Sequence, residues 1–204
     1  MRELLETGLL RLGLQPTTVL CENYLTYIEL LTKWNKVYNL TAIKGAEAML
    51  NRHVLDSLSV HSYIQGEQCL DVGTGAGLPG MILALAQPEK KWTLLDSNQK
   101  KLRFIQHVKT ALCIKNIEIV YARVEDFKPQ LGFDTVICRA FSSMENYLSL
   151  VKHLCNVDCV VLAMKAAKAE EECLSIKMLS KTSEIILLDV PGADGQRALI
   201  RVKL

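Results

Sequence analysis

A glycine-rich segment that directly follows an apolar run constrains this chain more than any other feature. The segment reads CLDVGTGAGLPG, residues 69–80, and has glycine at positions 73, 75, 77 and 80. Glycine has no Cβ, so it adopts positive φ angles and lets the backbone approach a ligand closely. A carboxylate, Asp71, stands just before the first of these glycines. We therefore predict a buried strand followed by a ligand-binding loop.

The residues after this loop alternate between predicted strands and predicted helices. Strands are predicted over 68–72, 92–97, 117–122, 133–141 and 159–165. Helices are predicted between them, over 79–86, 98–112, 143–154 and 167–180. This order indicates a mostly parallel sheet with helices on both of its faces.

The two ends of the chain depart from this alternation. Strands at 183–190 and 196–204 are separated by PGADG alone, which predicts an antiparallel hairpin. The N-terminal residues have apolar positions at helical spacing and predict helices over 2–12, 17–38 and 46–64. We accordingly divide the chain into a helical N-terminal extension, 1–64, and an α/β domain, 65–204.

Composition narrows the function classes only partly. Half of the 204 residues are hydrophobic, which suffices for a sizeable core, and the formal net charge is +2. That charge permits a nucleic-acid partner if the basic residues gather on one face.

No apolar run approaches the ~20 residues that span a membrane, so we expect no membrane partner and a cytoplasmic protein. The seven scattered cysteines are expected to be free thiols, and no metal site is predicted.

Two ligand classes fit the glycine loop, besides its interpretation as a tight turn. Residues 75–80 match the G-x-G-x-x-G pattern of dinucleotide enzymes, with Asp96 about 20 residues further on. However, Asp71 would repel a pyrophosphate at the helix N-terminus, and too little chain remains for a second nucleotide-binding half. S-adenosyl-L-methionine carries an ammonium and a sulfonium instead, and a nearby carboxylate favours both. D-x-G-x-G-x-G, over Asp71, Gly73, Gly75 and Gly77, resembles the first motif of class I methyltransferases.

An ordered set of short motifs resembles one family of such enzymes. The motifs are TKWNKVYNLTAI (32–43), RHVLDSL (52–58), DVGTGAGLPG (71–80), LLDS followed by KK (94–101), RVEDF (123–127) and CRAF (138–141). Together they resemble the glucose-inhibited division protein B family, bacterial methyltransferases that modify N7 of a guanosine in the decoding-region loop of 16S ribosomal RNA. The resemblance runs nearly end to end, with Cys138 standing where the family more usually has serine. It implies the class I S-adenosylmethionine-dependent fold, a seven-stranded sheet with an antiparallel C-terminal hairpin.

The resemblance also implies roles for particular cofactor-binding residues. Asp71, Gly73, Gly75 and Gly77 form the loop, and Gly73 and Leu78 line the methionine side of the cofactor. Asp96 accepts hydrogen bonds from the ribose hydroxyls. The adenine is expected beside Val124 and Glu125, and the product is S-adenosyl-L-homocysteine.

Basic residues near the same site are expected to serve the RNA. Arg139, at the end of the fourth strand, is predicted to contact both cofactor and target base and to act in catalysis by hydrogen bonding to guanine O6. The alternative for Arg139 is a structural salt bridge to Glu125 or Asp96. His53, Arg123 and Lys165 are candidates for gripping RNA phosphate. The stripe of Tyr24, Trp34 and Tyr38 is interpreted as core rather than as a base-stacking surface.

The chemistry implied by the family needs no general base. Guanine N7 has a free lone pair at neutral pH, so it attacks the methyl group directly in an in-line displacement. The expected partner is 16S rRNA in the small ribosomal subunit, and the protein is expected to be a monomer. Two alternatives stay open: a class I methyltransferase acting on another RNA base or a small molecule, and a non-enzymatic module that binds S-adenosylmethionine.

Overall fold

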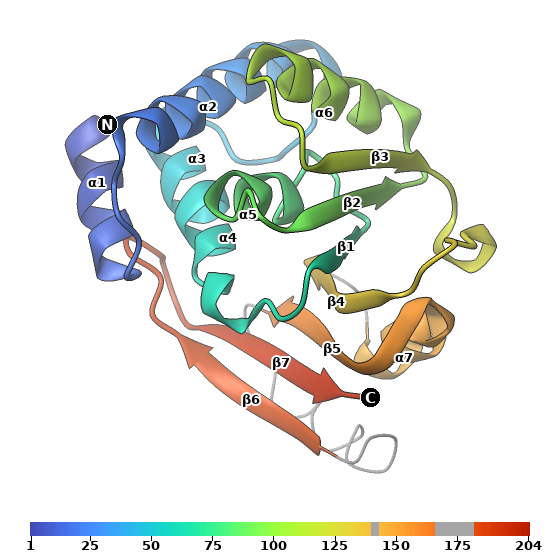
Figure 1. The fold of residues 1–204 in the computed structure, drawn as a ribbon. Coiled ribbons are helices and arrows are strands. Elements are labelled where there is room, and N and C mark those ends of the chain that lie inside the picture. Colours follow the sequence, from blue (N-terminus) through green and yellow to red (C-terminus); the bar gives the residue numbers. More distant parts are fainter. Residues whose placement is uncertain (140–142, 166–181) are drawn as a thin grey trace.

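A seven-stranded sheet forms the centre of the molecule in a computed structural model, which describes residues 1–139, 143–165 and 182–204 (Figure 1). The strands follow the order β3-β2-β1-β4-β5-β7-β6. Strands β1 to β5 are parallel, and β7 is antiparallel to both β5 and β6, so the predicted sheet and closing hairpin are confirmed. The strands are β1 (Gln68–Val72), β2 (Lys91–Asp96), β3 (Ile117–Tyr121), β4 (Phe133–Arg139), β5 (Cys155–Lys165), β6 (Thr182–Leu188) and β7 (Arg197–Lys203).

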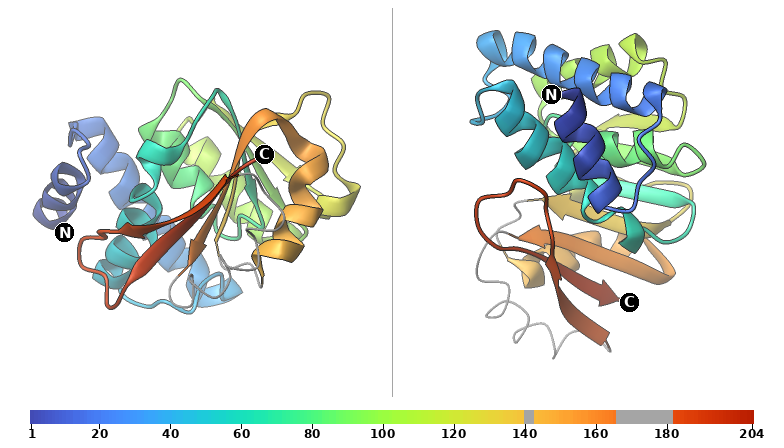
Figure 2. Two further views of the ribbon diagram at one scale, coloured as in Figure 1. Left: turned by 90° about the horizontal axis from the view of Figure 1, so that it is seen from below. Right: turned by 90° about the vertical axis from the view of Figure 1, so that its left-hand side faces the viewer.

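Helices cover both faces of this sheet (Figures 1 and 2). One face carries α2, α5 and α6, whose apolar residues share a cluster with the sheet, and the other face carries α7. The helices are α1 (Arg2–Arg11), α2 (Thr18–Tyr38), α3 (Ala46–Met49), α4 (Asp56–Leu58), α5 (Gly80–Ala86), α6 (Gln99–Ala111) and α7 (Met144–Val151).

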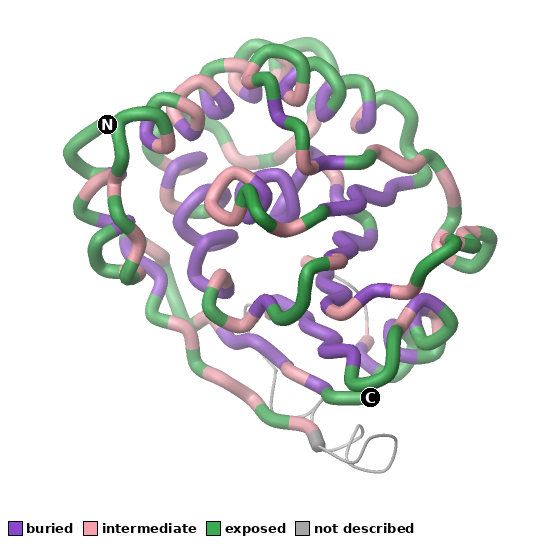
Figure 3. The backbone as a smooth tube through the Cα atoms, in the orientation of Figure 1, coloured by how far each residue is buried: buried purple, intermediate pink, exposed green. Residues whose placement is uncertain are grey.

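Neighbouring residues of the central strands face opposite sides of the sheet, because side chains alternate along a strand. On β1, Cys69 packs with the α5 and α6 side while Leu70 packs with α7. On β2, Leu94 packs on the α5 and α6 side and Leu95 packs on the α7 side. Burial on both faces explains why these strands read as continuous apolar runs, and Figure 3 shows the buried stretches along them.

The prediction of one continuous helix over 46–64 is wrong. This segment consists of α3, a π-helical segment over Leu50–Leu55, α4, and a separate 3₁₀ turn over His61–Tyr63. A π-helical turn shifts side chains and carbonyls out of the α-helical register and is frequent at functional sites. Here the carbonyl of Arg52 accepts hydrogen bonds from His53 Nδ1 at 3.0 Å and from Arg139 Nη1 at 3.2 Å. The irregularity therefore faces the end of β4.

The N-terminal helices pack directly on the α/β part of the chain. Leu5 and Leu9 of α1 and Ile28 and Leu31 of α2 belong to the same apolar cluster as the strands. The domain division at residue 64 stays a prediction. The predicted helix at 167–180 lies outside the described residues. Among the helices that the structure describes, none has the length and apolar character to cross a membrane.

Candidate active site

The glycine segment forms the loop between β1 and α5, and Asp71 holds its shape. Asp71 is fully buried at the end of β1. Its Oδ2 accepts hydrogen bonds from Thr74 Oγ1 at 2.6 Å and from the backbone N–H of Gly80 at 2.8 Å. A Cβ on Gly80 would lie 2.7 Å from that of Asp71, so only glycine fits there. Positive φ angles of 69°, 63° and 88° occur at Gly73, Gly75 and Gly77.

The other carboxylate oxygen of Asp71 is buried beneath the site, and Asp71 lines neither of the two pockets described below. Oδ1 is buried and has no hydrogen-bond partner among the described residues. Burial raises the pKa of Asp71 to about 6, although the hydrogen bonds from Thr74 and Gly80 oppose that change. A buried acceptor without a partner is costly, and a cation or a donor placed beside it removes the cost.

Asp96, at the end of β2, ties the loop to the neighbouring strand. Its Oδ2 accepts from Gly75 N and its Oδ1 from Asn98 N, both at 2.8 Å. The carbonyl of Leu95 accepts from Gly73 N at 2.8 Å and from Thr74 N at 3.0 Å. Each carboxylate oxygen has a second lone pair, so Asp96 can still accept hydrogen bonds from a bound hydroxyl.

A pocket of about 160 Å³ opens beside Asp96 at the carboxyl ends of β1, β2 and β3. Four of the residues predicted to bind a cofactor line it together: Gly73, Asp96, Val124 and Glu125. Arg123, predicted to grip phosphate, lines the same pocket. Leu78 lies in the apolar cluster instead, at a cis peptide bond to Pro79, and it does not line the pocket.

A second pocket, of about 310 Å³, lies at the carboxyl ends of β4 and β5, along the same edge of the sheet. It contains two of the predicted RNA-binding residues, Arg139 and Lys165. Asp56 from α4 and Arg197 from β7 also line it. The described residues that line it thus include three basic side chains and one carboxylate.

Arg139 forms no ion pair with Glu125 or Asp96, the two carboxylates named in the alternative interpretation of this residue. Its Nη1 lies 3.5 Å from Oδ2 of Asp56, and Arg197 Nε lies 3.2 Å from Oδ1 of the same carboxylate. Asp56 is mostly buried, which raises its pKa, while the two guanidinium groups oppose the rise. The alternative prediction of a salt bridge from Arg139 to Glu125 or Asp96 is therefore wrong. The partner is Asp56, which comes from the N-terminal helices.

The comparisons with known proteins agree with this geometry. The family model of rRNA small subunit methyltransferase G matches residues 20–200. The chain is 44% identical to ribosomal RNA small subunit methyltransferase G of Methylobacillus flagellatus over 200 residues, covering 98% of this chain and 97% of that protein. It is 45% identical to the Legionella pneumophila protein of the same name, covering 99% and 94%.

The chain belongs to the rRNA small subunit methyltransferase G family. The resemblance read from the ordered motifs is therefore confirmed. Solved structures agree on the fold. A methyltransferase from Geobacter sulfurreducens matches with a TM-score of 0.62 at 13% identity, covering 88% of this chain and 90% of that one. An S-adenosylmethionine-dependent methyltransferase from Aquifex aeolicus matches with a TM-score of 0.56 at 16% identity, covering 76% and 92%.

The residues of this methyltransferase G chain fit S-adenosyl-L-methionine. Asp71 Oδ1 is a buried acceptor in need of a partner, and the cofactor brings an ammonium and a sulfonium. Asp96 borders a pocket in which a ribose would meet its free lone pairs. Groups of His, Cys, Asp or Glu arranged to hold a metal ion are absent from the described part of the chain.

His53 lies close to this site but in an unexpected role. It is buried, its Nδ1–H donates to the carbonyl of Arg52, and its Nε2 lies 2.9 Å from Thr41 Oγ1. Burial, with Arg139 nearby, lowers the pKa of His53 to about 4, so the ring is neutral at pH 7. A neutral, buried ring attaches the segment after α2 to the π-helical segment, and this placement argues against phosphate binding by His53.

Sequence reasoning missed several residues of the site. No role in the site was predicted for Asp56 or Arg197, although both line the pocket that contains Arg139. Tyr27, assigned to no role, donates its hydroxyl to the carbonyl of Ala76 at 2.9 Å and so holds α2 on the glycine loop. The only signal for Tyr27 is its spacing of three residues from Tyr24 in a predicted helix, which does not reveal where a hydroxyl points.

Proposed function

We propose that this methyltransferase transfers a methyl group from S-adenosyl-L-methionine to N7 of a guanosine in 16S ribosomal RNA. The proposal rests mainly on one observation. The pocket containing Gly73, Asp96 and Val124 and the basic pocket containing Arg139 open at the same edge of the sheet. Family membership supports the class of substrate, because the relatives are named for the RNA of the small subunit.

The first pocket holds the cofactor in this proposal. Asp71 Oδ1 attracts its positively charged methionine end, Asp96 binds the ribose hydroxyls, and the turn at Val124 and Glu125 receives the adenine. Bound there, the cofactor supplies an electrophilic methyl group. The loop is already shaped by Asp71 and Tyr27, so binding orders few additional groups.

The second pocket holds the target guanine. N7 is unprotonated at neutral pH and its lone pair forms the new bond to carbon while the bond to sulfur breaks, so no side chain has to remove a proton. Arg139 donates hydrogen bonds to O6, beside N7, and Asp56 fixes the direction of its guanidinium. Arg197 and Lys165 add positive charge for the flanking phosphates. The work of the protein is positioning.

Substitution of Arg139 tests this assignment. We expect Arg139→Ala to lower the rate of methyl transfer to purified small subunits about 100-fold, because a charged hydrogen bond of about 1.5–3 kcal/mol is lost. Arg139→Lys should retain part of the rate, since lysine keeps the charge but not the planar donor pair. The matched control is Arg201→Ala, because Arg201 on β7 pairs with Glu184 and lines neither pocket.

The same assay separates the alternatives. Transfer of label to subunits, with cofactor binding by calorimetry intact in all variants, supports the proposal. Equal rates for wild type and Arg139→Ala would overturn the role of Arg139. Cofactor binding without any S-adenosylhomocysteine formation would instead identify a binding module, and turnover indifferent to RNA would identify a small-molecule enzyme.

A further inference from the structure

The positive charge of this chain is concentrated in two segments that lie side by side. Residues 30–46 and 97–117 contain eight of the 24 lysines and arginines and none of the 22 aspartates and glutamates. The rest of the chain therefore has sixteen basic residues against 22 acidic ones, a formal charge of −6. The modest net charge of +2 conceals this separation. Local charge, and not the net value, determines which partner a surface attracts.

The basic side chains of these segments have no acidic partner among the residues that the structure describes. Lys33, Lys36, Lys100 and Arg103 are exposed, and none of them forms an ion pair there. Elsewhere the pattern is mixed. Arg2, Arg11, Arg52, Arg201 and Lys203 each pair with a carboxylate, whereas other exposed lysines such as Lys91 and Lys152 do not within the described residues. The unpaired charges are therefore available to an external anion.

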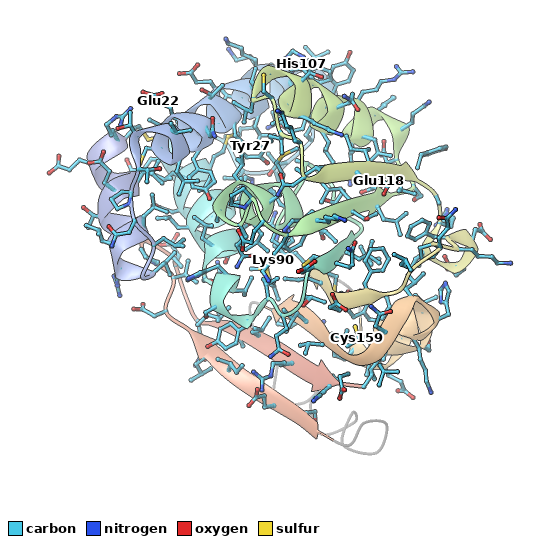
Figure 4. The ribbon with its side chains drawn as sticks, in the orientation of Figure 1. Glu22, Tyr27, Lys90, His107, Glu118 and Cys159 are labelled. Atoms are coloured by element: carbon cyan, nitrogen blue, oxygen red, sulfur yellow. The ribbon has the colours of Figure 1, made fainter. Side chains whose placement is uncertain are left out.

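Aromatic rings lie among these charges where α2 meets α6. The ring centroids of Tyr38 and Trp34 are 5.2 Å apart, and those of Trp34 and His107 are 5.3 Å apart. The interpretation of the whole stripe as core is wrong for Tyr38, which is exposed, while Tyr24 is fully buried. His107 is exposed as well, and Figure 4 shows it on the outer side of the molecule beside α2. On α6, Lys100, Arg103 and His107 recur at intervals of three and four residues and so share one face. Trp34 thus links the exposed faces of the two helices.

We name this surface the basic–aromatic face: Lys33, Trp34 and Tyr38 of α2, with Lys100, Arg103 and His107 of α6. It starts at the cofactor pocket, because α6 begins three residues after Asp96, which lines that pocket. The N-cap of α6, Asn98, is held by Asp96 Oδ1. The other helix, α2, is attached to the glycine loop through Tyr27. Both helices are therefore fixed relative to the reacting groups.

We propose that the basic–aromatic face is a second RNA-binding surface, which holds the phosphodiester backbone and unpaired bases of the small-subunit RNA outside the reaction site. This inference rests on the proposed function. Lysine and arginine neutralise phosphates, and exposed rings stack on unpaired bases. A membrane surface would meet the charges as well, but the exposed rings at this junction favour stacking on bases.

Two sets of substitutions test the proposal against a matched control. The first converts Lys33, Lys100 and Arg103 to glutamine together. The control converts Lys91, Lys128 and Lys152, three exposed lysines outside both basic segments, in the same way. The second set is Tyr38→Ala with His107→Ala. The assays are the KM for purified small subunits, its dependence on salt, and cofactor affinity by calorimetry.

For the charge variant we expect at least a tenfold rise in KM for subunits, with unchanged kcat and cofactor affinity. The slope of log affinity against log salt should fall by about 2, since each lost phosphate contact contributes about 0.7–0.9. For the ring variant, affinity should fall with the slope unchanged, because stacking releases no counterions.

Three results would contradict the inference in separate ways. If the charge variant matches its control on subunits, the face binds no RNA. If both variants retain subunit affinity but the charge variant alone loses binding to phosphatidylserine vesicles, the face is a membrane surface. If wild-type protein transfers no methyl group to subunits, the proposed function itself fails, and that outcome is visible before any variant is made.

Discussion

At the scale of single residues, the two carboxylate oxygens of Asp71 differ in a way that the sequence could only partly predict. The position of Asp71 before the glycines indicated a loop that favours a cation, and this stays a prediction. The pattern did not indicate that Oδ2 would be used to shape the loop, with only Oδ1 left over. Which oxygen accepts which donor depends on the fold of residues up to nine positions away. Sequence spacing alone cannot resolve that division.

The raised pKa of Asp71 predicts a pH dependence. Its folded pKa of about 6 exceeds the reference value of 3.8, so burial of the charged form lowers the free energy of unfolding progressively as pH rises from about 4 to 6. A cationic cofactor favours the charged form, so its affinity should increase as pH rises through about 6. Calorimetry between pH 5 and 7.5 measures this, and Asp71→Asn should flatten the profile.

The control for that prediction is Asp134→Asn. Asp134, like Asp71, accepts two hydrogen bonds through one carboxylate oxygen, in this case from the backbone N–H groups of Glu67 and Gln68, but it lies at the amino edge of the sheet. The Asp134→Asn substitution should lower the free energy of unfolding and leave the pH profile of cofactor binding unchanged. A flat profile in the wild-type protein would contradict the role of Asp71.

Asp56 provides a second prediction at this scale. Its carboxylate holds Arg139 and Arg197 at 3.5 Å and 3.2 Å, so Asp56→Asn should let both guanidiniums move. We expect kcat to fall about 10- to 100-fold, since small displacements of positioning groups have effects of that size, with cofactor affinity unchanged. Asp194→Asn, which breaks an exposed pair with Arg52, is the comparison. Equal kcat values for the two variants would discard the positioning role.

At the scale of elements, regular segments were predicted well and the irregular ones were not. β1, α2 and α6 match their predicted ranges closely, because apolar period and capping residues such as Thr17 and Asn98 mark them. The π-helical segment over Leu50–Leu55 was missed, because the same apolar spacing suits an α-helix. That segment carries Arg52 and His53. Because the π-helical turn was missed, the buried position of His53 was missed as well.

The tight contact between β1 and α5 gives the element-scale prediction. A Cβ on Gly80 would lie 2.4 Å from Leu94 Cδ2 and 2.7 Å from Asp71 Cβ. Gly80→Ala should therefore lower the free energy of unfolding by about 1–3 kcal/mol and weaken cofactor binding. Thermal unfolding and calorimetry measure the two effects. Gly13→Ala, at a φ of 78° with open space around it, should lose stability through backbone strain alone and keep cofactor affinity. Wild-type cofactor affinity in Gly80→Ala would refute the close-packing argument.

At the scale of the whole molecule, the structure places two pockets at one edge of the sheet. The order of motifs, through a family resemblance, predicted the fold and the family. The cofactor-binding roles stay predictions, although four of the residues concerned line one pocket. It could not predict that Asp56, from the N-terminal helices, would join Arg139 and Arg197, from β4 and β7. Contacts between residues 83 and 141 positions apart leave no local pattern in a single sequence. The N-terminal helices are thus part of the site as well as part of the core.

The most direct test of the central claim is to map the methyl group. Purified protein would be incubated with S-adenosyl-L-methionine carrying a labelled methyl and with small subunits that lack the modification, and the RNA would be digested for mass spectrometry. The account predicts about one label per subunit, on N7 of one guanosine, and loss of that label with Arg139→Ala. Label on another atom or base, or cofactor binding without transfer to RNA, would contradict it.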